Sequence, residues 1–101
     1  MIYELRSYTV NQGKMGALSA RFRDKTMQIF EKHGIKNVAY WTNAVGGRND
    51  EFIYLLAHQD MGAFERAWAA FTKDPEWLAA REESERDGVA LVAHWENRLL
   101  T

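Results

Sequence analysis

Charged side chains at two-residue spacing are the clearest candidates for chemistry in this sequence. Glu4 and Arg6 lie near the N-terminus, and His94, Glu96 and Arg98 lie near the C-terminus. Side chains two residues apart project from the same face of a strand. If the two segments are neighbouring strands with coinciding faces, these residues form a mixed-charge ladder. One interpretation of such a ladder is a salt-bridge network that fixes the register between two copies of the chain in a dimer. The other is a group beside a ligand that acts as an acid or base or orients an anion.

Large aromatic side chains are the second candidate. The 101 residues include four Trp, four Tyr and five Phe. Large rings fill a small core economically, and they also line pockets for small molecules. The second interpretation predicts a cleft between sheet and helices, with these candidate ligand-binding residues: Arg6, Tyr40, Trp41, Tyr54, His58 and Trp68.

No catalytic residue can be assigned from sequence patterns. The chain contains no Ser-His-Asp arrangement, P-loop or dinucleotide-binding fingerprint. His33, His58 and His94 lie on different predicted elements, without the i,i+4 or His-x-His spacing that fixes metal ligands. We therefore expect neither a metal nor a cofactor, and whether the protein is an enzyme stays open.

Composition limits the classes of partner. A net charge of −1 gives no electrostatic reason to expect a nucleic acid or an anionic membrane. No stretch approaches the roughly 20 apolar residues that span a bilayer, and the N-terminal segment is charged where a signal peptide is apolar. Cysteine is absent, so disulfides and thiolate chemistry are excluded. We expect a cytoplasmic protein.

The elements that must position these residues follow from hydrophobic periodicity and turn residues. Residues 1–101 are predicted to form one α+β domain with the ferredoxin-like order βαββαβ, a four-stranded antiparallel sheet covered by helices on one side. Asp60 and Asp74-Pro75 are expected to begin helices, and Gly34 to end one. The predicted strands are 2–10, 35–45, 51–58 and 89–100, and the predicted helices are 14–33, 60–71 and a shorter one from Pro75.

Both faces of the predicted sheet are rich in apolar side chains. We expect the face that includes Leu5 and Leu55 to contact the helices, and the face that includes Tyr8 and Tyr54 to lie on the other side. A solvent-facing sheet surface rarely holds so much apolar area. A homodimer that packs sheet against sheet would bury it.

Four segments of the chain resemble the NIPSNAP family. They are residues 2–10 with Gly13-Lys14, residues 30–35, residues 40–42, and residues 66–71 with 74–77. The resemblance covers nearly the whole chain in the expected order. It implies a dimeric α+β barrel and no established catalytic residues.

Related dimeric α+β barrels include cofactor-free monooxygenases that act on planar aromatic substrates, and haem-degrading enzymes. Three hypotheses follow for this chain. The first is a NIPSNAP-like homodimer of unknown molecular function that binds a small apolar or aromatic ligand between sheet and helices. The second is a cofactor-independent monooxygenase-like enzyme acting on an aromatic substrate. The third is a structural or interaction module that works through its dimer.

Overall fold

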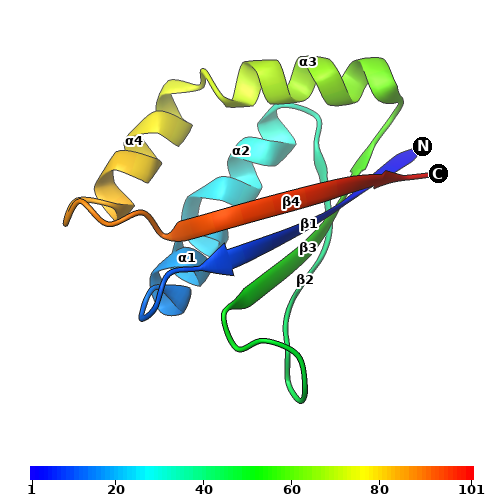
Figure 1. Ribbon diagram of the computed structural model, residues 1–101. Helices are drawn as coiled ribbons and strands as arrows, with labels where there is room; N and C mark the ends of the chain where they lie inside the picture. Colours follow the sequence, from blue (N-terminus) through cyan, green and yellow to red (C-terminus); the bar gives the residue numbers. More distant parts are fainter.

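The computed structural model describes all residues, 1–101, as one antiparallel sheet with helices on one side (Figure 1). The strands lie in the order β2-β3-β1-β4. The order of elements along the chain confirms the predicted βαββαβ arrangement. The strands are β1 (Ile2–Val10), β2 (Lys36–Thr42), β3 (Glu51–His58) and β4 (Val92–Leu100), and the helical segments are α1 (Met15–Arg21), η1 (Phe22–Thr26), α2 (Met27–Lys32), α3 (Met61–Phe71) and α4 (Pro75–Ser84).

The predicted helix boundaries rest on local hydrogen bonds. The Asp60 carboxylate accepts from the backbone N–H of Ala63 at 2.8 Å, and Asp74 accepts from the N–H of Glu76 at 2.8 Å. Both contacts satisfy amides that have no partner inside the helix. Gly34 has φ +79°, a left-handed conformation that ends the preceding helix at little steric cost. No helix is long and apolar enough to cross a membrane.

The first predicted helix is interrupted by a wider turn. Residues 14–33 were expected to form one helix, but η1 is π-helical and separates α1 from α2. No Gly or Pro occurs between residues 17 and 33, so composition gives no sign of the interruption. Within it, the Thr26 hydroxyl donates to the Arg21 carbonyl at 3.3 Å. The wide turn begins directly after Arg21.

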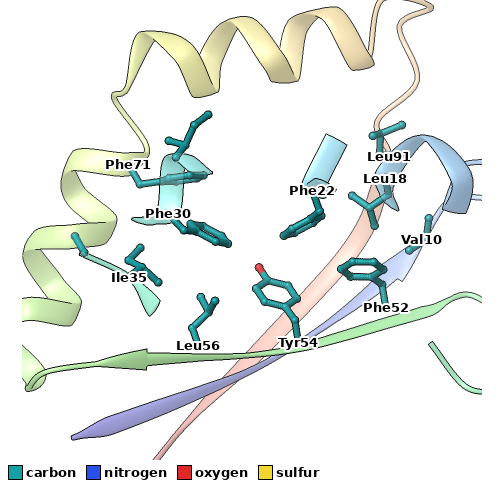
Figure 2. Close-up of a cluster of buried hydrophobic side chains, with 12 residues drawn as sticks. Val10, Leu18, Phe22, Phe30, Ile35, Phe52, Tyr54, Leu56, Phe71 and Leu91 are labelled. Carbon is teal, nitrogen blue, oxygen red and sulfur yellow. The ribbon is translucent and has the colours of Figure 1, made fainter. Parts of the chain in front are cut away.

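The core lies between the sheet and the helices and is largely aromatic. Figure 2 shows Phe52 and Tyr54 projecting from β3 toward Phe22 and Phe30. The Phe22 ring centroid lies 4.9 Å from that of Phe52 and 5.0 Å from that of Tyr54. These contacts fix the distance between η1 and β3.

The prediction of which sheet face meets the helices was wrong. Glu4, Arg6 and Val10 of β1 are buried on the helical side, together with Tyr54 and the other even-numbered residues of β3. A shift of one residue exchanges the two faces of a strand, and both faces here are apolar enough to be inside. Hydrogen bonds satisfy the charged side chains of Glu4 and Arg6, so these two side chains can be buried.

The predicted mixed-charge ladder is also absent. Strands β1 and β4 are neighbours, but His94, Glu96 and Arg98 pair with Thr9, Ser7 and Leu5, on the face away from the helices. Asn97 pairs instead with Arg6. Glu4 pairs with Leu99, and the side-chain amide of Asn97 donates to the Glu4 carboxylate.

Candidate functional site

Glu4 is the centre of a buried polar network contributed by four elements. Its Oε1 accepts from Trp68 Nε1 of α3 at 2.8 Å and from His58 Nε2 of β3 at 2.9 Å. Its Oε2 accepts from Arg6 Nη1 of β1 and from Asn97 Nδ2 of β4, both at 2.9 Å. Since an ionised carboxylate only accepts, His58 carries its proton on Nε2. One carboxylate thus joins three strands and a helix.

The network keeps Glu4 ionised. Burial raises the pKa of this carboxyl, but hydrogen bonds from His58, Asn97 and Trp68, together with the charge of Arg6, outweigh burial and lower the pKa to about 2. Both oxygens are fully engaged. Glu4 therefore acts as an anchor for its donors.

Arg6 lies between two indole rings. Its guanidinium carbon is 4.4 Å from the Trp68 ring centroid and 4.6 Å from that of Trp95. Nε donates to the Tyr54 hydroxyl at 2.7 Å, and Nη1 donates to Glu4. Burial lowers the pKa of Arg6, but its neighbours Tyr54, Tyr8 and Glu4 raise it further than burial lowers it. A stacked, paired guanidinium is a rigid element of the site.

Two hydrogen-bonded tyrosine hydroxyls lie beside Arg6. The Tyr54 hydroxyl accepts from Arg6 and lies 2.7 Å from the Tyr8 hydroxyl. Tyr54 is completely buried, and burial raises its pKa, so it keeps its proton. The geometry of the bond between the two hydroxyls allows either tyrosine to be the donor.

A cleft of about 630 Å³ opens beside this network. It lies between helices α3 and α4 and the strands β1 and β4. Aromatic rings form much of its wall, and charged groups lie among them. The lining residues used below are Glu4, Arg6, Tyr8, Arg21, Trp68, Phe71, Trp77, Arg81, Glu85, Ala93, Trp95 and Asn97.

The structure distributes the predicted ligand-binding residues over three locations. Arg6 and Trp68 line the cleft, and Tyr54 and His58 support them from behind. Tyr40, half-buried on the edge strand β2, stacks on Tyr54 at 5.1 Å between ring centroids. Trp41 pairs with Ile53 on the opposite sheet face and is 50% exposed.

Several lining residues were absent from the predicted site. Tyr8, Trp77, Trp95 and Asn97 line the cleft, and Glu4, predicted only as part of a ladder, holds it together. Trp95 and Asn97 alternate on β4, and Tyr8 continues the alternation of Glu4 and Arg6 on β1. Had the sheet faces been assigned correctly, this alternation would have identified them.

Comparison with known proteins relates the whole chain to one family. A family model described as NIPSNAP matches residues 3–101. The structure of Atu4242 from Agrobacterium tumefaciens, described as a NIPSNAP family protein of unknown function, has a TM-score of 0.83 at 26% identity, over 100% of this chain and 92% of that one. A NIPSNAP domain protein from Burkholderia xenovorans also has a TM-score of 0.83, at 20% identity, over 100% and 93% of the two chains.

A more distant structural relative is an enzyme. SnoaB from Streptomyces nogalater, a cofactor-independent oxygenase, has a TM-score of 0.62 at 17% identity, over 99% of this chain and 90% of that one. At this identity the similarity establishes a common fold. No protein of curated function matches the sequence.

Proposed function

The chain belongs to the NIPSNAP family, and from this premise we propose that it binds a small, planar, apolar or aromatic ligand in the cleft beside Arg6. One observation carries the proposal: a cleft of about 630 Å³ has Arg6 held between Trp68 and Trp95 in its lining. Ligand sites typically occupy about 300–1,000 Å³ and combine apolar walls with a few placed polar groups. This cleft has both properties.

The walls are held in place before a ligand arrives. The Trp68 indole N–H is bonded to Glu4, and the Phe71 ring packs against both Trp68 and Trp77, with centroid distances of 5.3 Å and 4.9 Å. Rings fixed in this way lose little further freedom on binding. A flat ligand would stack on these faces.

Binding is better supported than acid–base chemistry. A general base needs a lone pair within reach of the ligand. The Glu4 oxygens accept four hydrogen bonds from protein donors, and the pKa of the carboxyl is about 2. Glu4 is therefore not available to take a proton from a ligand.

We also propose that the working form is a homodimer. The sheet face away from the helices carries Leu5 and Leu55, with Tyr3, Trp41 and Leu100 at 40%, 50% and 41% exposure. His94, Glu96 and Arg98 of β4 lie on the same face, and the exposed apolar side chains grouped beside them support an interaction surface. A second copy packed sheet against sheet would cover it and leave the cleft open on the helical side.

Binding can be measured with N-phenyl-1-naphthylamine, a neutral dye that fluoresces in apolar sites. Ala93 lines the cleft and is exposed, so Ala93→Trp fills the cleft without touching the core. Ala70 is exposed on α3 outside the cleft, and Ala70→Trp is the matched control.

We expect saturable binding by the wild type and by Ala70→Trp. Ala93→Trp should bind at least about tenfold more weakly, a loss of ~1.4 kcal/mol. If the two variants bind the dye equally well, the dye does not occupy the cleft and the proposal is wrong.

A further inference from the structure

We propose, on the basis of the binding role proposed above, that the ligand is an aromatic carboxylate whose carboxylate group is received by Arg21. Arg21 is the last residue of α1 and lines the cleft beside α4. The aromatic body would extend from there along Trp77 and Phe71 toward Trp68. The arginine at one end of the cleft has a carboxylate of its own, and the arginine at the other end shares one. This difference determines both the charge and the orientation of the proposed ligand.

Arg21 is buried but incompletely paired. Its side chain is 6% exposed, and Nη1 donates to Ser84 Oγ at 3.0 Å and to Glu85 Oε2 at 3.3 Å. Nε is buried without any partner, and Nη2 makes no hydrogen bond to the protein. Nε and Nη2 form the edge through which a guanidinium binds a carboxylate with two parallel hydrogen bonds. A buried donor without an acceptor is costly, so a carboxylate that reaches Nε when the Arg21 side chain shifts toward the cleft would remove that cost.

The one carboxylate that pairs with Arg21 is shared with other donors. Glu85 Oε2 also accepts from the backbone N–H of Leu91 at 3.2 Å, and Glu85 Oε1 lies 3.6 Å from Arg81 Nε. One carboxylate therefore faces two guanidinium groups. At the Arg6 end of the cleft, the Glu4 carboxylate faces one guanidinium group, that of Arg6.

The charges in the lining add up to the same conclusion. Arg6, Arg21 and Arg81 are positive, and Glu4 and Glu85 are negative, so the cleft has one net positive charge. The whole chain has a net charge of −1. Burial lowers the pKa of Arg21 more than Glu85 raises it, which agrees with an incompletely compensated cation.

The backbone at Arg21 is also unusual. The π-helical segment η1 begins at the next residue, Phe22, and the Arg21 carbonyl accepts from the Thr26 hydroxyl. Wide turns of this kind inside helices occur frequently at functional sites. The Arg21 guanidinium carbon lies 4.8 Å from the Trp77 ring centroid, so the cation is presented beside an aromatic wall.

Isothermal titration calorimetry with 2-naphthoate and 2-naphthamide tests this inference, because the two probes have nearly the same shape and differ in charge. We expect wild-type protein to bind the carboxylate at least about tenfold more tightly than the amide. Arg21→Gln should reduce this preference to about threefold or less. Arg23→Gln is the matched control, since Arg23 lies on the same helical stretch with its side chain 71% exposed and does not line the cleft; it should keep the full preference.

The outcomes separate the inference from the function on which it rests. If neither probe binds, the proposed function itself fails. If both bind wild type equally, or if folded Arg21→Gln keeps the preference, the cleft binds aromatic molecules but Arg21 does not select an anion. Circular dichroism will show whether Arg21→Gln folds. If Arg21→Gln does not fold, Arg21→Lys is used in its place, because lysine keeps the charge but cannot form the two parallel hydrogen bonds. If Arg21→Lys retains the full wild-type preference for the carboxylate over the amide, the assignment of Arg21 as the carboxylate-binding residue is wrong.

Discussion

Glu4→Gln perturbs the network at its centre. The glutamine side chain has nearly the shape of glutamate, but one of its oxygens is replaced by an NH2 group that only donates. In wild type each Glu4 oxygen accepts two hydrogen bonds. Whichever way the amide turns, its NH2 group would face two donors, and the Arg6 charge would lose its counterion. We therefore expect a large loss of stability.

The magnitude follows from the burial of Glu4 and from its pKa. Breaking a buried ion pair by removing one partner costs about 3–5 kcal/mol. Independently, lowering the pKa of Glu4 from 4.5 to about 2 corresponds to about 3 kcal/mol of stabilisation. Because the folded-state pKa is the lower one, this contribution is complete above pH 4.5 and is lost as the pH falls toward 2. In the Glu4→Gln variant the side chain at position 4 does not titrate, so this contribution to the pH dependence is absent.

The assay is urea unfolding followed by tryptophan fluorescence between pH 7 and pH 3, at one fixed protein concentration. At pH 7 Glu4→Gln should be less stable than wild type by about 3 kcal/mol or more, and the difference should shrink as the pH falls. Glu65→Gln, on the exposed side of α3, is the control and should change stability by less than about 0.5 kcal/mol. A Glu4→Gln curve parallel to wild type across the pH range would refute this reasoning.

Two further predictions concern stability and assembly. Asp74 accepts from Lys32 and His33 and caps α4, and these donors, Lys32 first, lower its pKa. Asp74→Asn should lower the melting temperature at neutral pH, and the difference in melting temperature from wild type should become smaller in acid. A difference that does not change with pH would argue against the ion pairs. Light scattering during size-exclusion chromatography should give wild type a mass twice that of one chain, which is 11.7 kDa. The Leu55→Asp variant should have the mass of one chain. A wild-type mass of 11.7 kDa would exclude the dimer.

Local sequence signals predicted the fold well. The caps at Asp60 and Asp74 and the left-handed Gly34 act over a few residues, and each was confirmed. The π-helical turn after Arg21 has no comparable local signature, since neither Gly nor Pro marks it. Packing of Phe22 against β3 is a contact between distant parts of the chain, and the sequence alone does not display it.

The site was only partly predictable because it depends on which face of each strand points toward the helices. Arg6 and Trp68 were predicted and do line the cleft, whereas Trp41 lies on the other sheet face. Glu4 was expected beside His94 and Glu96, but the register of β4 brings Asn97 to it instead. When both faces of a strand are apolar, a shift of one residue reverses the assignment of every side chain on it.

The most direct test of the central claim, that the cleft binds planar aromatic molecules, uses the four tryptophans as internal probes. Trp68, Trp77 and Trp95 line the cleft, and Trp41 lies on the opposite face of the sheet. Two-dimensional ¹H–¹⁵N NMR resolves each indole N–H while neutral 2-naphthamide is added. We predict progressive shifts of the Trp68, Trp77 and Trp95 signals while Trp41 stays in place. Shifts confined to Trp41, or none at any indole, would contradict the proposed binding site.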